Sequence, residues 1–228
     1  MERKSYSVTK RSSDSIDFTK AEIWDDIAPL FIDMYMWVHN NYAPKVSVSI
    51  FHTDRFIYLY YHVPEDRITI RHTSFGSEVW KDSCVEFFLN PFPESSDEYV
   101  NMEFNALGVM LIGVGKDGDD SKRYYFKAKE VEGFETVSSI KHPVVGVHGS
   151  ACWTLHVKIP KSFFENHYGR KFTGRKTIAN FNKCGDETEF EHYGSWNEIS
   201  SPTPNFHLPQ YFGDLIFKSA SDQEFVNV

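Results

Sequence analysis

Short segments in which hydrophobic and polar residues alternate recur along the chain, about one every ten residues, with turn residues between them. Residues 46–50 alternate Val and Ile with Ser, residues 56–63 resume after Thr-Asp-Arg at 53–55, and residues 153–159 alternate again. Successive side chains of a strand point to opposite faces, so this period predicts β-strands and makes 46–63 a hairpin. Residues 160–164 are the best helix candidate, because proline is favoured in a first helical turn.

This pattern predicts an all-β fold, an antiparallel β-sandwich of jelly-roll or immunoglobulin-like type with at most one or two short helices. Residues 1–20 are polar and are interpreted as an N-terminal arm whose last part can join the sheet. Residues 21–228 are expected to form a single domain, since the 228-residue chain has a length routine for one all-β domain and shows no linker or internal repeat.

The stretch 78–91, EVWKDSCVEFFLNP, has two chemically different faces if it is a strand. Val85, Phe87 and Leu89 would share one face. If the strand is regular back to Trp80, the other face holds Trp80, Asp82, Cys84, Glu86 and Phe88. A carboxylate beside aromatic rings, opposite an aliphatic face, is unusual in a purely structural strand and indicates a binding surface.

The segment 99–115 supplies a candidate partner for that strand. It alternates so that Met102 and Phe104 face one way and Glu103 and Asn105 the other. If the two strands pair, Glu86 and Glu103 lie on the same face. The structural alternatives are that Trp80 fills an edge of the core, that Glu86 forms an ion pair with a neighbouring Lys or Arg, and that Glu103 is at the surface or ion-paired.

Charge and composition exclude several classes of partner. The net charge is −8 and basic residues form no cluster, so no nucleic acid is expected as a partner. No membrane association is expected, because no apolar run is long enough to span a bilayer. A signal-peptide pattern is also missing, so the protein as written starts inside the cell or has lost an export signal. Aromatic residues reach 16%, which suits strands and surfaces that grip planar ligands.

Metal and cofactor signals are weak. Cys84, Cys152 and Cys184 have no CxxC spacing and are interpreted as free thiols, with two of them buried, and the ten histidines form no HExxH pattern. Asp117, Asp119 and Asp120 resemble half of a calcium loop, but position 128 is Ala where a bidentate Glu is needed, so a solvated turn is favoured. We therefore expect no catalytic metal and no cofactor.

Several separated pieces together resemble family 9 carbohydrate-binding modules, relatives of the DOMON-like sugar- and haem-binding β-sandwiches. The pieces are Ile23-Trp24, the hairpin 46–63, VWKDSCVEFFLNP at 79–91, Glu103-Phe104-Asn105, CWTLHVKIP at 152–160, Gly194-Ser195-Trp196 and NFHLPQYFGDLIF at 205–217. The resemblance covers nearly the whole chain, and the order and spacing of the pieces are more specific than any single piece.

The resemblance implies a carbohydrate site. In the family, a Trp six residues before a strand Glu forms one side of an aromatic clamp and the Glu binds sugar hydroxyls, and Trp80 and Glu86 match this spacing. Phe206, three residues before Pro209, stands where the family has a Trp, and Glu103 stands where it has an Arg. Asn105 fits a neighbouring polar position, and His207 follows Phe206 in the same Pro-rich loop, where a packing role is the structural alternative. Some members also carry structural calcium.

Two functions of different classes remain open. The first is non-catalytic binding of a mono- or oligosaccharide in glycan utilisation, with possible association with glycoside hydrolases. The alternative is a glycoside hydrolase, or an accessory subunit of one, that uses Glu86 and Glu103 as a carboxylate pair. Haem binding is a weaker third possibility, because Met102 has the parity of a core residue. Trp24, Trp153 and Trp196 are expected in the core.

Overall fold

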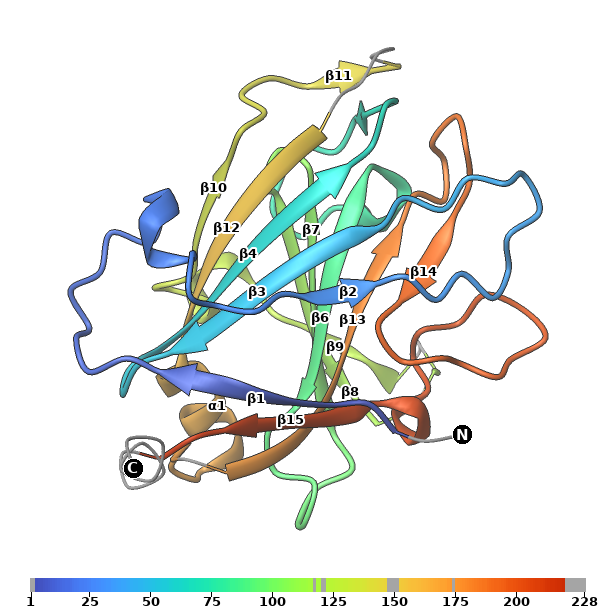
Figure 1. Cartoon of the computed structure of the whole chain (residues 1–228). Helices are drawn as coiled ribbons and strands as arrows, with labels where there is room; N and C mark the ends of the chain where they lie inside the picture. The colour runs from blue at the N-terminus through green and yellow to red at the C-terminus, as the bar shows by residue number, and fades with distance from the viewer. Residues whose placement is uncertain (1–2, 117, 120–121, 147–151, 174, 220–228) are drawn as a thin grey trace.

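The computed structural model describes residues 3–116, 118–119, 122–146, 152–173 and 175–219. Most strands of these residues belong to one sheet that curls into two facing layers (Figure 1). The strands are β1 (Ser5–Lys10), β2 (Leu30–Ile32), β3 (Val46–His52), β4 (Phe56–Pro64), β5 (Thr69–Ile70), β6 (Cys84–Asn90), β7 (Tyr99–Asn105), β8 (Met110–Gly115), β9 (Tyr124–Tyr125), β10 (Glu135–Ser138), β11 (Val144–Val145), β12 (Cys152–Pro160), β13 (Arg175–Cys184), β14 (Tyr193–Ser195) and β15 (Gly213–Phe217).

The first layer runs β10-β12-β4-β3 with β2 beside β3, and the second runs β15-β13-β6-β7-β8-β9 with β14 beside β13. Strand β1 joins the layers, because its first four residues pair with β15 and its last two pair with β3. The all-β sandwich is therefore confirmed. Both pairings of β1 are parallel, unlike the antiparallel ladders elsewhere, and β1 lies within the segment interpreted as an arm.

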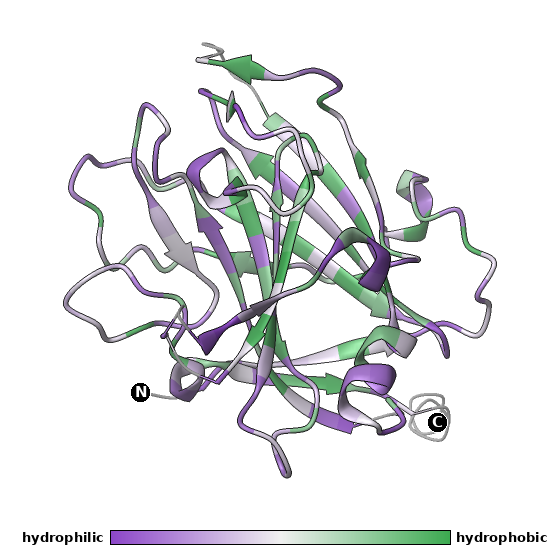
Figure 2. Ribbon diagram, turned by 180° about the vertical axis from the view of Figure 1, so that it is seen from behind, coloured by the Kyte–Doolittle hydropathy of each residue, from purple (hydrophilic) through white to green (hydrophobic). Residues whose placement is uncertain are grey.

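The main core fills the space between the layers. It contains the aliphatic face of β6 and, from β7, Met102 and Phe104, as the alternation predicts. Trp153 and Trp196 also lie in this core, whereas Trp24 belongs to a smaller cluster with Phe51 on the outer face of the first layer. Hydrophobic residues concentrate on the strands, and the connecting loops are mostly hydrophilic (Figure 2). The core position of Met102 leaves it unsuited to bind a haem iron.

The one α-helix among the described residues, α1 (Lys161–Tyr168), is the helix predicted at 160–164. Pro160 caps its start, and Gly169 ends it with a φ of 64°, a left-handed conformation that glycine adopts without strain. No helix of the described chain is long and apolar enough to span a membrane.

Two local departures from strand regularity shape the second layer. Strand β6 begins at Cys84, and the preceding Val79–Lys81 forms a 3-10 turn, so Trp80 is presented by a turn rather than by the strand. The segment 99–115 is two strands, β7 and β8, joined by a turn at residues 106–109. The predicted hairpin of β3 and β4 forms in regular antiparallel register.

Candidate functional site

A pocket of about 270 Å³ opens on the face of the second layer that points away from the main core. Its described lining residues are Trp80, Glu86, Glu103, Tyr125, Cys184, Asp186, Tyr193, Pro204, Asn205, Phe206 and His207. Five of the six residues predicted from the sequence are therefore brought together. The sixth, Asn105, is not among them.

Two carboxylates form the floor of the pocket. Glu86 of β6 lies directly opposite Glu103 of β7 in the ladder, and directly opposed side chains share a face with Cβ atoms about 5 Å apart. The Glu86 carboxylate accepts hydrogen bonds from Cys184 Sγ at 3.1 Å and from Asn182 Nδ2 at 3.2 Å. Glu103 Oε1 accepts one from Asn101 Nδ2 at 2.8 Å. Both glutamates are nearly buried, with 3% and 4% of their surface exposed.

Burial changes the ionisation of the acidic residues at this site. Burial raises the pKa of Glu86 to about 7, and nearby Asp186 acts in the same direction, against the lowering effect of the two hydrogen bonds. Burial likewise raises the pKa of Asp186 to about 6. The carboxylates thus hold protons closer to neutral pH than exposed carboxylates do.

Trp80 forms one wall of the pocket and is held by its backbone. Val79 beside it is fully buried, and the Trp80 carbonyl accepts a hydrogen bond from the Asp186 amide at 3.3 Å. Lys81, the next residue, forms an ion pair with Glu187 at 3.1 Å. The 3-10 turn and the loop between β13 and β14 are therefore tied together, which fixes Trp80 relative to Asp186.

The Pro-rich loop before β15 supplies further lining residues. Phe206 is only 8% exposed, because its ring packs on Trp37 and Tyr193 with centroids 6.0 and 6.2 Å away. It therefore offers the pocket part of its ring rather than a full face. Asn205 precedes it, and its Oδ1 accepts the His207 amide hydrogen at 2.9 Å.

His207 has a structural role on the wall it shares with Phe206. Its Nδ1 lies 2.8 Å from the Tyr99 hydroxyl, and its ring packs 4.8 Å from that of Phe88. Burial, and then the charge of Arg123, lower the pKa of His207 to about 3. The imidazole is therefore neutral at physiological pH and brings no positive charge to the pocket.

Asn105 does not line the pocket, and its side-chain amide is used within the fold. Its Nδ2 donates to the His72 carbonyl at 2.7 Å and to Asp82 Oδ2 at 2.9 Å. Its Oδ1 accepts from the amides of Leu107 at 3.2 Å and Val109 at 3.0 Å. All its hydrogen-bonding capacity organises the β7–β8 turn and the segment after Trp80, because β7 ends at this residue.

Sequence reasoning missed Asp186, Tyr193, Asn205 and Tyr125. Asp186 lies in a loop with no alternation to read, and Tyr193 belongs to a strand of three residues. Tyr125 comes from RYYFKAK, a segment already expected to be a strand, but nothing in it indicated which tyrosine faces a pocket. Asn205 was within reach, because it adjoins Phe206 in the predicted loop.

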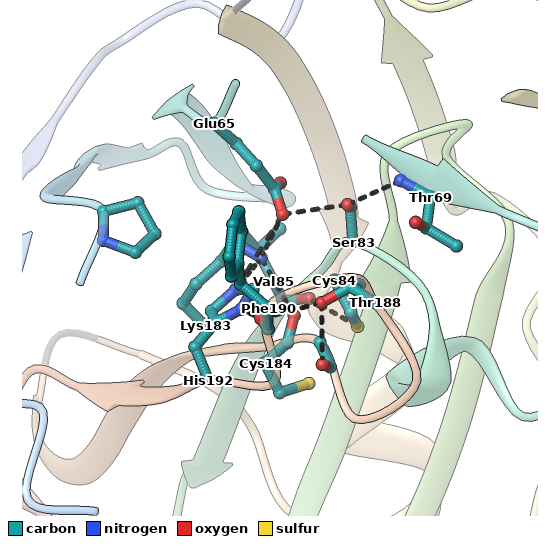
Figure 3. A network of polar contacts seen from close by, with 12 residues as sticks. Glu65, Thr69, Ser83, Cys84, Val85, Lys183, Cys184, Thr188, Phe190 and His192 are labelled. Carbon is teal, nitrogen blue, oxygen red and sulfur yellow. Dashed lines mark hydrogen bonds and ion pairs between the residues drawn. The ribbon is translucent and has the colours of Figure 1, made fainter. Parts of the chain in front are cut away.

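A second polar cluster lies behind the pocket, on the core side of β13. Lys183 Nζ is 3.3 Å from Glu65 Oε1 and 2.7 Å from His192 Nε2, and both charged side chains are fully buried. The Glu65 carboxylate also accepts from Ser83 Oγ at 2.9 Å and from Trp153 Nε1 at 2.7 Å. Figure 3 shows Glu65, Ser83, Lys183 and His192 converging from separate parts of the chain. We call these residues, with Trp153, the closed network.

Metal-ligand geometry points to one group among the described residues: Cys84, Glu86 and Cys184, with ligand atoms within 4.8 Å of one another. Thiols do not suit calcium, which prefers oxygen ligands. Of the predicted acidic turn, Asp117 and Asp120 lie outside the described residues, and Asp119 is paired with Lys122 at 2.8 Å. Cys152 is exposed, and all three cysteines are free thiols, two of them buried as expected.

Comparison with known proteins agrees with the fold. The model of the family described as "Carbohydrate-binding family 9" matches residues 19–217. A crystal structure described as a putative carbohydrate-binding protein from Bacteroides uniformis ATCC 8492 is 32% identical, with a TM-score of 0.86 over 95% of this chain and 100% of that one. No curated protein matches the chain.

Two more distant structures share the fold. Both are family 9 carbohydrate-binding modules from Caldicellulosiruptor kristjanssonii. One, in complex with glucose, is 15% identical with a TM-score of 0.62 over 96% of this chain and 98% of that one. The other, in complex with cellotriose, is 14% identical with a TM-score of 0.61 over 98% and 99%.

Proposed function

Because the chain belongs to carbohydrate-binding family 9, we propose that it binds carbohydrate without catalysis, in the pocket between Trp80 and Phe206. The observation that carries this proposal is the convergence of an aromatic wall and paired acidic acceptors on one concave site. Saccharides present apolar C–H faces together with hydroxyl donors, which such a lining complements. The glucose and cellotriose complexes of the two distant modules support the same class of ligand.

In this proposal the aromatic and polar residues make different contacts with the saccharide. Trp80, held by its backbone, stacks on a pyranose face and displaces water from it, and the exposed part of Phe206 closes the other side of the clamp. Glu86 and Glu103 accept hydrogen bonds from hydroxyls and fix the orientation of the ring. Asn205 adds an amide at the rim. Asn105 acts indirectly, by holding Asp82 and so the turn that carries Trp80.

The pocket has a volume suited to a sugar unit rather than to a long groove-bound polymer. We extend the proposal to a role in glycan utilisation, in which the protein retains mono- or oligosaccharides and associates with glycoside hydrolases. This role follows from the binding activity and is tested separately, by co-purification with such enzymes.

Replacing Trp80 with alanine tests the site. Burial of a large apolar ring against a ligand contributes about 1.5–3 kcal/mol, so Trp80→Ala should weaken binding by about tenfold to a hundredfold on a glycan array and in titration calorimetry. The melting temperature should change little, because Trp80 is only partly buried and lies at a turn. Phe31→Ala is a matched control, since Phe31 is an exposed aromatic outside the pocket. An unchanged glycan profile in Trp80→Ala would disprove the assignment.

One observation favours glycoside hydrolysis as a second candidate. Glu86 faces Glu103, and its pKa is raised to about 7, as a general acid requires. Turnover of aryl-glycosides by the wild type that disappears in Glu86→Gln would establish catalysis. Binding without turnover in the wild type would leave the non-catalytic function alone.

A further inference from the structure

The pocket is strongly acidic. Glu86, Glu103 and Asp186 all line it, and no described lining residue is lysine or arginine. His207 is neutral because burial lowers its pKa to about 3. The described lining therefore carries up to three negative charges and no positive one.

The nearby basic residues have partners outside the pocket. Lys183 belongs to the closed network on the opposite face of β13, and Lys81 pairs with Glu78 and Glu187 at 3.0 and 3.1 Å. Arg123 donates to Asn101 Oδ1 at 2.7 Å and to the Tyr99 hydroxyl at 2.6 Å. None of the three lines the pocket.

Two further features indicate a ligand that brings positive charge and hydrogen-bond donors. Trp80, Tyr125, Tyr193 and Phe206 surround the carboxylates with aromatic rings, whose faces attract cations. Asn182, directly opposite Glu86 on the same sheet face but not itself a lining residue, has a fully buried Oδ1 with no hydrogen-bond partner among the described residues. The site thus offers acceptors in excess of donors.

Building on the carbohydrate-binding function proposed above, we propose that the preferred ligand is a saccharide with a free amino group, whose ammonium lies among Glu86, Glu103 and Asp186. An ammonium carries three donors and no acceptor, which complements a lining of acceptors. Its charge also relieves the repulsion between carboxylates held close together. A neutral sugar leaves that repulsion in place.

The ionisation of the pocket carboxylates agrees with this assignment. Burial and mutual repulsion raise the pKa of Glu86 to about 7, and burial raises that of Asp186 to about 6. A bound cation favours the charged carboxylates and lowers both pKa values. Binding of an amino sugar near pH 6.5 should therefore release protons, which calorimetry in buffers of different ionisation enthalpy measures.

The direct test is titration calorimetry of the full chain with three probes: D-glucosamine, D-glucose and N-acetyl-D-glucosamine. We expect D-glucosamine to bind at least about tenfold more tightly than D-glucose at pH 7, because charge-assisted hydrogen bonds exceed neutral ones by that order. N-acetyl-D-glucosamine separates charge from size, since acetylation removes the charge and retains the nitrogen substituent. It should show no such advantage.

Asp186→Asn removes one charge while retaining shape, so it should lower the ratio of D-glucosamine to D-glucose affinity by about fivefold to tenfold. Glu132→Gln removes an exposed carboxylate outside the pocket and should leave the ratio unchanged.

Equal affinities for D-glucosamine and D-glucose would overturn the amino-sugar inference and leave the proposed function standing. A preference that survives both Asp186→Asn and Glu103→Gln would overturn it as well. A failure to bind any saccharide would overturn the proposed function itself.

Discussion

Strand β13 separates two buried polar sites of opposite character. On its core side, Lys183 joins the closed network, in which the Glu65 carboxylate receives a cation, a hydroxyl and an indole N–H. On its outer side, Asn182 and Cys184 contact Glu86 in the pocket, where no described lining residue is lysine or arginine. Neighbouring residues of β13 therefore belong to two sites: Lys183 to the closed network, whose charges are paired, and Asn182 and Cys184 to the surroundings of the acidic pocket.

The comparison shows how buried polar groups that stabilise the fold differ from buried polar groups that bind a ligand. A buried charge without a partner is costly, so a structural site satisfies its charges internally. A binding site leaves acceptors for the ligand to satisfy and tolerates that cost in its free state. The raised pKa of Glu86, to about 7, is one expression of this cost. Substitutions on the two faces should therefore affect different measurements.

The largest effect is expected in the closed network. Lys183→Met leaves the buried Glu65 carboxylate without its cation, which should lower the free energy of unfolding by about 3–5 kcal/mol. Chemical denaturation measures this loss directly. The double variant Glu65→Gln, Lys183→Met should recover much of it, since no uncompensated charge remains. A single variant as stable as the wild type would show that the network is not neutralised as described.

On the pocket side of β13, the cost of burying the Glu86 carboxylate should make the free energy of unfolding depend on pH. Burial raises the pKa of Glu86 from its ordinary value of 4.5 to about 7, so the folded state binds the proton more tightly than the unfolded state. Stability is therefore full below about pH 4.5 and is lost as pH rises towards 7, by about 2–3 kcal/mol. Glu86→Gln should lack this component. The difference between the two unfolding free energies, measured from pH 4 to 8, gives the effect, and a constant difference would contradict it.

The sequence predicts the two-faced character of β6 because period-two alternation is a local signal. Val85 and Phe87 lie in the core, and Glu86 faces Glu103, since the register between β6 and β7 follows from which face is apolar. The same logic places Trp80 correctly in the pocket for an inexact reason. It was assigned by strand parity, whereas a 3-10 turn presents it.

The loop contributions to the pocket could not be predicted in the same way. Asp186 and Tyr193 reach the site because backbone hydrogen bonds tie the β13–β14 loop to the turn at Trp80. Such bonds do not depend on side-chain type, so the pattern of residues does not predict them. Asn105 shows the converse. Its position in the alternation places it on the pocket face of β7. However, a turn begins directly after it, and its side-chain amide bonds to the backbone of that turn.

Asn105, whose amide bonds within the fold, and Asn205, whose amide lines the pocket, allow a direct comparison of effects on stability and on binding. Asn105→Ala leaves the Leu107 and Val109 amides without their acceptor and removes one of the donors to Asp82, so stability should fall by about 2 kcal/mol. Asn205→Ala removes a rim amide that makes a single hydrogen bond to the described residues, so the loss of binding free energy should exceed the loss of stability. Thermal denaturation and calorimetry of both variants give the comparison. The reverse pattern would place Asn105 in contact with the ligand.

The smallest effect concerns Cys184, the pocket-side neighbour of Lys183. Burial raises the pKa of the Cys184 thiol, and it raises that of Cys84 to about 11, whereas Cys152 is exposed. Only the thiolate reacts, so a disulfide reagent should label Cys152 at least about a hundredfold faster than the other two. Cys152→Ser should remove the fast phase, and unfolding should release two slow thiols. Rapid labelling of Cys184 in the native protein would mean that the acidic pocket is open to solvent at its floor, and that its acceptors are satisfied by water rather than held for a ligand.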